Sequence, residues 1–186
     1  MSDEKTLVQS GTNPELTPAP LPADDSRPTY FPVSLSKLVV MNCCTLGAYQ
    51  YYWFYENWQL IQKRESLDIR PFWRTFFAVV YCFPLFEKIE RAGDLLNLRQ
   101  SISSGVLAGG WVLLSVLSML PDPYWLVTFL SVVFLVPVQQ QINWINERLA
   151  PGHDPNKNFT AWNILAVVVG GSFFVLAVTV TFFAME

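Results

Sequence analysis

Charge-free runs of mostly apolar residues dominate the chain after residue 34. They cover Leu38–Tyr55, Gln100–Pro121, Tyr124–Asn146 and Asn158–Met185, with 18, 22, 23 and 28 residues. At a rise of about 1.5 Å per residue, roughly 20 helical residues cross the hydrocarbon core of a bilayer, which is about 30 Å thick. Each run is therefore near or above the length that a transmembrane helix requires.

These runs predict the organisation of the whole chain. We expect an all-α, polytopic membrane protein with four full transmembrane helices, at about 35–58, 101–120, 124–146 and 161–184. Pro121 and Pro123 predict a tight turn between the second and third helices, because proline disfavours helix at and just before its own position. Residues 1–30 hold five prolines among small polar residues, which predicts a disordered, acidic tail before the helical membrane domain of residues 31–186.

A shorter apolar segment, residues 71–86, has two possible interpretations. Only its last 12 residues, Thr75–Phe86, are free of charge. The segment is therefore either a re-entrant element or a fifth span in which Arg74 extends to the surface and the bilayer thins. The positive-inside rule favours the first alternative, with nine basic residues on the cytoplasmic side against eight for five spans. That arrangement places the N-terminal tail outside.

An amphipathic helix is expected next, over residues 85–98. Apolar residues recur there at helical spacing, whereas Glu87 and Arg91 form an i,i+4 pair on another side. Such a helix lies at the membrane interface.

Polar residues follow one side of the first predicted helix. Asn42, Thr45, Tyr49, Tyr52 and Glu56 recur at spacings of three and four residues, which place them on one narrow stripe of a continuous helix. Lipid offers no hydrogen bonds, so these groups need partners within the protein. The stripe therefore either forms hydrogen bonds between helices or is a polar path centred on Glu56. Arg74 is the nearest basic residue that could pair with Glu56.

A second polar stripe lies at the inner end of the predicted helix 124–146. Gln139, Asn143 and Asn146 occupy positions i, i+4 and i+7 after Pro137. They predict either a small hydrated cavity or the point where the helix leaves the bilayer.

Small residues predict where helices approach each other closely. Gly105 and Gly109 are four positions apart, and so are Ala166 and Gly170. This small-xxx-small pattern serves packing within one chain and packing between copies equally well.

Composition and charge exclude several functional classes. Charged residues make up 15% of the chain, and its net charge is −3, so it offers no basic surface for nucleic acid. Its three cysteines and single histidine lack the spacing of a zinc site, and no nucleophile motif surrounds the histidine. We therefore expect no metal, no cofactor, no catalytic residue and no enzymatic activity.

Seven aromatic residues occupy the ten positions from Tyr49 to Trp58 and encircle the predicted helix, as an aromatic belt at the lipid headgroups does. Six positions here spell the motif TxGxYxxYWxY: Thr45, Gly47, Tyr49, Tyr52, Trp53 and Tyr55. With PFWRTFF, VPVQQQINWIN and NKNFTAWNI further along, the chain resembles a family of small, uncharacterised bacterial inner-membrane proteins that carry this domain of unknown function. The resemblance covers most of residues 30–171 and implies a bacterial cytoplasmic membrane, but no reaction. Glu56 departs from the family pattern, which has lysine before Asn57.

Two functional hypotheses follow. The first is a non-enzymatic, multi-pass membrane protein that acts by association, as a scaffold, an accessory subunit or an envelope-stress component. The alternative is a small oligomeric transporter or channel that uses the stripes Asn42–Glu56 and Gln139–Asn146. The expected partners are the lipid bilayer and other membrane proteins or further copies of this chain.

Overall fold

The computed structural model describes residues 27–98, 101–118 and 124–183, and every regular element in these ranges is a helix. The elements are α1 (Leu35–Cys44), α2 (Ala48–Glu65), α3 (Pro71–Phe76), α4 (Ala78–Leu95), α5 (Ser104–Leu117), η2 (Tyr124–Ser131, a 3-10 helix), α6 (Val132–Leu149) and α7 (Ala161–Phe183). The all-α prediction is therefore confirmed. Residues 1–26 of the expected tail and the turn expected at 121–123 lie outside the described residues.

The stretch 35–58 is two helices that form a hairpin, not one helix. Leu46 and Gly47 between them have φ angles of 53° and 83°, which lie outside the range of an α-helix. Gly47 has no Cβ and adopts this conformation without steric cost. The Thr45 hydroxyl accepts from the N–H of Tyr49 at 3.0 Å and so caps the start of α2. The expectation of a continuous helix is corrected, because freedom from charge does not report where the backbone turns.

The two ends of this first hairpin meet. The N–H of Phe31, just before α1, donates to Oδ1 of Asn57 on α2 at 3.1 Å, although 26 positions separate the two residues. The Phe31 ring also lies edge-on to the Tyr52 ring, with centroids 5.6 Å apart. α1 and α2 therefore run in opposite directions, and the 10 residues of α1 extend only about 15 Å.

Residues 66–87 form a second reversal that also returns to its starting point. Glu65 at the end of α2 forms an ion pair with Lys88 of α4, with 2.7 Å between Oε2 and Nζ. Between these residues, α3 leads away and α4 leads back, and Phe77 joins them. Both ends of the short apolar segment 71–86 therefore lie on one side of the bundle.

The amphipathic helix expected over 85–98 is the second half of α4, which ends at Leu95. Leu85 and Ile89 are fully buried there, whereas Glu87 and Arg91 form an ion pair at the surface. This half of α4 covers the core with one face and carries its charges on the other.

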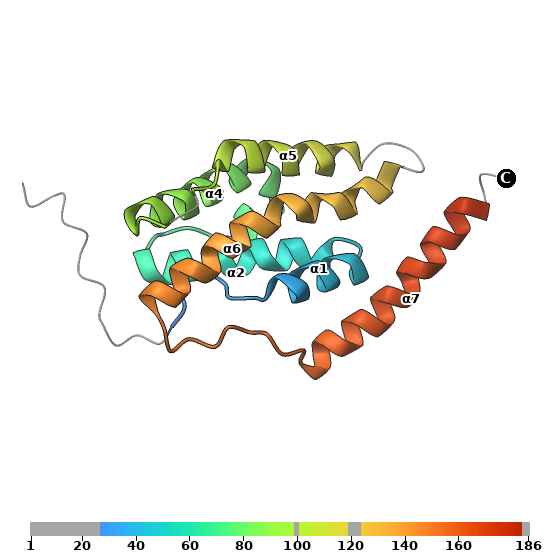
Figure 1. The fold of residues 1–186 in the computed structure, drawn as a ribbon. Coiled ribbons are helices and arrows are strands. Elements are labelled where there is room, and N and C mark those ends of the chain that lie inside the picture. The colour runs from blue at the N-terminus through green and yellow to red at the C-terminus, as the bar shows by residue number, and fades with distance from the viewer. Residues whose placement is uncertain (1–26, 99–100, 119–123, 184–186) are drawn as a thin grey trace, which may run out of the picture.

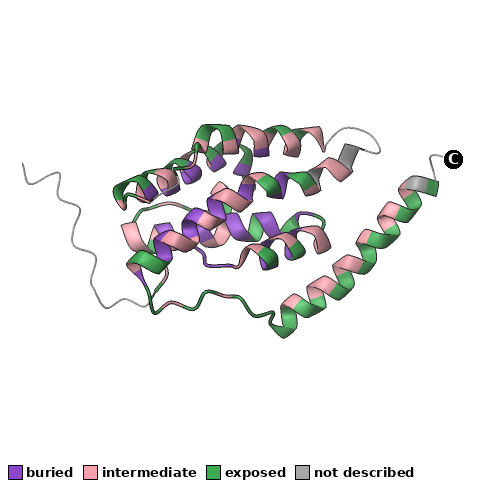
Figure 2. Cartoon of the chain, viewed as in Figure 1, coloured by how far each residue is buried: buried purple, intermediate pink, exposed green. Residues whose placement is uncertain are grey.

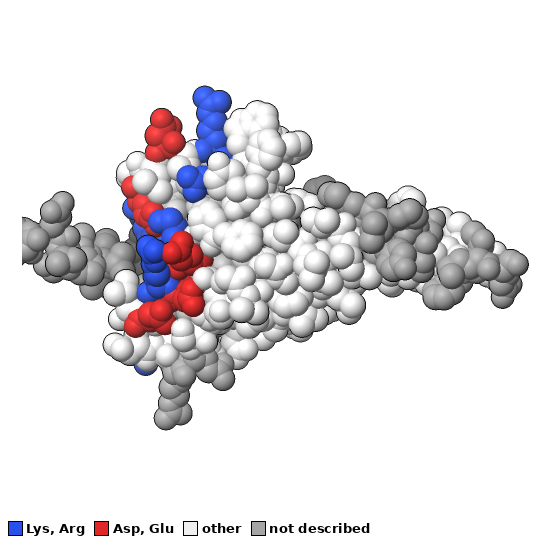
Figure 3. Space-filling view, turned by 90° about the horizontal axis from the view of Figure 1, so that it is seen from above, with Lys and Arg blue, Asp and Glu red and all other residues white. Residues whose placement is uncertain are grey.

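Charged side chains gather at one end of the bundle, where α2, α4 and α6 end, which we name the charged end (Figures 1 and 3). α5 leads away from this end, and η2 and α6 lead back to it (Figure 1). The aromatic core lies between these helices. The ring of Phe54 on α2 is 4.9 Å from that of Trp111 on α5 and 6.2 Å from that of Phe86 on α4, measured between centroids.

α7 lies at the edge of the bundle and is largely exposed (Figure 2). It packs against α1, and a Cβ at Gly170 would lie 2.0 Å from the carbonyl oxygen of Cys44, so only glycine permits this approach. A Cβ at Gly105 or Gly109 would instead meet nothing within 4 Å. The small-residue face of α5 thus makes no close contact with the described part of the chain.

Among the described helices, α7 alone is long and apolar enough to cross a membrane, over Ala161–Thr181. The other expected spans are distributed over shorter helices: α1 with the first half of α2, α5, and η2 with α6.

Candidate functional site

Residues 29–33 form a non-helical segment, which we name the strap. It lies against α2 and α6 and leads into α1. Tyr30, Phe31 and Val33 are buried within the bundle, so the expected tail ends before Tyr30. A buried segment outside helices and sheets has to satisfy its main-chain N–H and C=O groups through other partners.

The five carbonyl groups of the strap accept hydrogen bonds from five side chains. The pairs are Thr29 with Arg64 at 2.7 Å, Tyr30 with Asn146 at 2.8 Å, Phe31 with Gln139 at 3.2 Å, Pro32 with Asn156 at 3.1 Å, and Val33 with Asn143 at 3.1 Å. The side-chain oxygens of Asn146 and Asn57 in turn accept from the N–H groups of Tyr30 and Phe31, both at 3.1 Å. An amide side chain carries a donor and an acceptor, so these residues replace the neighbouring strand that the strap lacks.

This arrangement gives partners to the inner polar stripe of Gln139, Asn143 and Asn146. All three turn towards the strap, and Nε2 of Gln139 also donates to Oδ1 of Asn143 at 2.8 Å. On its other side, Gln139 accepts from the indole N–H of Trp53 on α2. The stripe therefore joins α6, α2 and the strap, and its amides are engaged within the protein.

Charged side chains close the strap at the charged end. The guanidinium of Arg64 lies over the Tyr30 ring, 4.8 Å from its centroid, and the Tyr30 hydroxyl donates to the carbonyl of Lys88 at 3.3 Å. Burial by itself would raise the pKa of the Glu65 carboxyl, but its hydrogen bonds with Lys88 and Arg64 outweigh burial and hold the pKa below its ordinary value. Glu65 therefore stays ionised at neutral pH and links the end of α2 to the second half of α4.

The outer stripe is not a continuous seam, because the hairpin turn separates Asn42 from the three members on α2. Tyr49 is buried, Tyr52 is half exposed and Glu56 is half-buried, and the rings of Tyr49 and Tyr52 lie 5.6 Å apart between centroids. Asn42 is fully buried, and its side-chain amide has no partner among the described residues.

Arg74 is engaged by aromatic rings instead of by Glu56. Its guanidinium lies 4.4 Å from the Trp58 centroid and 5.2 Å from the Tyr81 centroid. The ion pairs of the described residues join other partners, among them Arg64, Glu65 and Lys88. The expected pair of Arg74 and Glu56 is therefore replaced by a cation–π contact between α3, α2 and α4.

Several residues of this network carry no signal in the sequence. Oε1 of Gln50 accepts from the indole N–H of Trp111 and from the Ser131 hydroxyl at 3.1 Å, which joins α2, α5 and η2. The sequence pattern did not identify Asn57 and Asn156 either. Their partners in the strap lie 26 and 124 positions away along the chain, and no spacing rule connects residues so far apart.

The arrangement is suited to holding helices together. No group of three or more histidine, cysteine or acidic residues in the described ranges is placed to hold a metal ion. Comparisons with protein-family models, with curated proteins and with solved structures found no match to this chain. The resemblance to small bacterial inner-membrane proteins therefore stays a prediction.

Proposed function

We propose that this chain is an integral membrane protein without enzymatic activity, which enters the bilayer from one side and acts by association with lipid and with other membrane proteins. One observation carries the proposal: the segments α1–α2, α3–α4 and α5–α6 each lead away from the charged end and back to it, and α7 alone does not return (Figure 1). The contacts that close these segments are Phe31 with Asn57, Glu65 with Lys88, and Asn146 with the strap.

The lengths of the helices indicate how far each segment enters the bilayer. α1 extends about 15 Å, half of the hydrocarbon core, so the α1–α2 hairpin is re-entrant. The α3–α4 segment is re-entrant for the same reason, since its ends meet. α7, with 23 residues and about 35 Å, crosses the bilayer. α5, and η2 with the first half of α6, are the remaining candidates for crossing as a pair.

Exposed apolar side chains on the rest of the surface fit this placement. Phe72, Trp73, Phe76 and Phe77 of the α3–α4 turn are 49–65% exposed and contact one another. In water such a cluster would be unfavourable, whereas in a bilayer it faces acyl chains. The open glycine face of α5 and the exposed faces of α7 then offer surfaces for other membrane proteins.

Cysteine labelling tests the arrangement. In a background without native cysteines, we would place single cysteines at Ser10, Ser66 and Phe183 and label intact cells with a membrane-impermeant maleimide. The strap contact holds Thr29 beside Arg64, near the end of α2, so the proposal predicts that positions 10 and 66 share one side. Crossing by α5, α6 and α7 puts Phe183 on the other. Opposite labelling of positions 10 and 66 would overturn the proposal and restore a first span at 35–58.

The alternative, a small oligomeric channel or transporter, has less support because Gln139, Asn143 and Asn146 are occupied by the strap. Proteoliposomes separate the two functions. We expect no proton or potassium flux above that of empty vesicles. A flux that Gln139→Leu and Glu56→Gln both abolish, with the protein still inserted, would favour the channel.

A further inference from the structure

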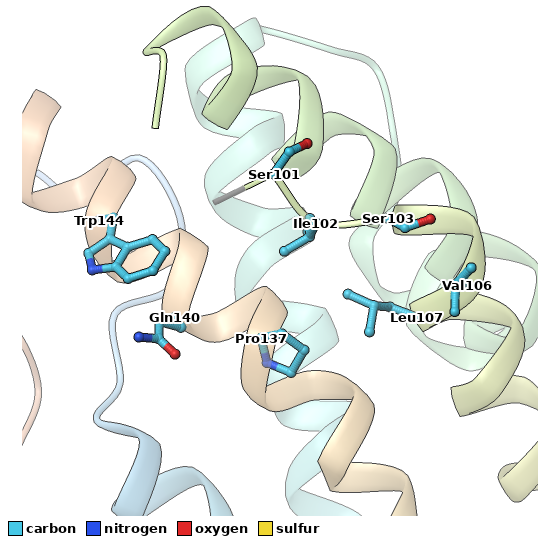
Figure 4. A pocket seen from close by; sticks show the side chains of 8 residues that line it. All are labelled: Ser101, Ile102, Ser103, Val106, Leu107, Pro137, Gln140 and Trp144. Carbon is cyan, nitrogen blue, oxygen red and sulfur yellow. The ribbon is translucent and has the colours of Figure 1, made fainter. Parts of the chain in front are cut away.

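A hollow lies between the start of α5 and the middle of α6, with a volume of about 470 Å³. Ile102, Val106 and Leu107 line one side, and Pro137, Gln140 and Trp144 of α6 line the other (Figure 4). A second hollow of about 520 Å³ is lined by Leu98, Glu147 and Arg148, and it shares Trp144 with the first. Both volumes fall in the range of small-molecule sites, about 300–1,000 Å³.

The two hollows follow one face of α6, where Pro137, Gln140, Trp144 and Arg148 recur at spacings of three and four residues, and we name them together the groove. From Pro137 to Arg148 the helix rises about 16 Å, and the shared Trp144 lies between the two parts. The part beside Pro137 is walled by aliphatic side chains of α5, with the Gln140 amide at its edge (Figure 4). The other part opens beside a carboxylate and a guanidinium. Among the described residues that line it, the groove is therefore apolar at one end and carries Glu147 and Arg148 at the other.

The change from apolar to charged residues along the groove follows the change from hydrocarbon to headgroups in a bilayer. Pro137 lies in the apolar part of α6, whereas Glu147 and Arg148 lie where α6 reaches the charged end. Tryptophan prefers the level of the lipid headgroups, where its ring contacts apolar groups and its N–H finds a polar partner. Trp144 sits at the boundary between the two parts, as a residue at headgroup level would.

We propose that this groove binds one phospholipid whose headgroup carries a phosphate and a primary ammonium. Arg148 contacts the phosphate, Glu147 contacts the ammonium, and an acyl chain lies along Val106, Leu107 and Pro137. The carboxylate of Glu147 disfavours a purely anionic headgroup, and a choline headgroup has no N–H to donate to it. The orientation of the lipid rests on the proposed membrane placement. Its binding is measured in detergent, so a failure here leaves the labelling result untouched.

Native mass spectrometry of the full chain in detergent tests the site. The protein is titrated with phosphatidylethanolamine, phosphatidylglycerol and phosphatidylcholine. We expect one phosphatidylethanolamine per chain, and a roughly tenfold weaker affinity in Arg148→Ala, since a charge-assisted phosphate contact is lost. Glu147→Ala should reduce the preference for phosphatidylethanolamine over phosphatidylglycerol. Arg91→Ala removes an exposed base of α4 that pairs with Glu87 and should leave binding unchanged.

A second variant separates loss of binding from loss of folding. Val106 is 67% exposed, so Val106→Trp fills the apolar part of the groove without entering the core. It should keep the unfolding midpoint of the wild type and lose the bound lipid. The proposal would be overturned if Val106→Trp retained each of the three lipids as strongly as the wild type does. An effect of Arg91→Ala as large as that of Arg148→Ala would also overturn it.

Discussion

Replacing Gln139 by alanine tests whether the amide network holds the strap in place. Gln139 is fully buried and connects three elements: it accepts from the indole N–H of Trp53, donates to the carbonyl of Phe31, and donates to Oδ1 of Asn143. Alanine leaves the Trp53 N–H and the Phe31 carbonyl without their partner. Trp53 is 0% and Phe31 8% exposed, so water does not readily replace the lost amide of Gln139.

The expected magnitude follows from those two groups. A buried donor or acceptor without a partner costs about 1–3 kcal/mol. Two of them predict that the free energy of unfolding falls by about 2–6 kcal/mol. The neighbouring Gln140 is the matched control, because it is an amide on the same helix that lines the α5–α6 groove. Gln140→Ala should change the free energy of unfolding by no more than about 0.5 kcal/mol.

Reversible unfolding in mixed micelles, followed by tryptophan fluorescence, measures both variants. Hydrogen exchange of the strap provides a local readout: the N–H groups of Tyr30 and Phe31 should exchange faster in Gln139→Ala, and those of α7 should not. Equal loss of stability in the two variants, or unchanged exchange in the strap, would refute the assignment of Gln139 to the strap.

Three further predictions use other parts of the fold. Gly47→Ala forces a Cβ into a left-handed backbone and should lower the free energy of unfolding by about 1 kcal/mol, whereas Gly109→Ala, in open space on α5, should leave it unchanged or raise it. Gly170→Ala should lower the free energy of unfolding by about 1–3 kcal/mol, because its Cβ would collide with Cys44; the adjacent Gly171→Ala, whose nearest neighbour is 3.9 Å away, should not. The depressed pKa of Glu65 stabilises the fold above about pH 4.5, the ordinary value, and this contribution is lost as pH falls through the folded-state pKa. Unfolding measured between pH 3 and 7 should therefore show a weaker pH dependence in Glu65→Gln, and identical curves for the two proteins would contradict the role of Glu65.

The outer stripe shows why a correct local pattern can mislead. Asn42, Tyr49 and Glu56 do have helical spacing, but spacing defines one face only if the helix is continuous. The left-handed backbone at Leu46 and Gly47 breaks that condition. Glycine in an apolar run is compatible with a backbone turn, as at Gly47, and with close helix packing, as at Gly170. The residue type alone therefore did not distinguish a turn from a packing contact.

By itself, the sequence determined the helical class, because long apolar runs and helical periodicity are local properties of the chain. It also located α7, whose length and composition suffice for crossing a bilayer. The tertiary structure alone decided that residues 35–58 turn back, and that Gln139, Asn143 and Asn146 hold the strap. The strap contacts join groups more than 100 positions apart. An amide side chain can serve any backbone group that approaches it, so its partner is set only when the helices pack.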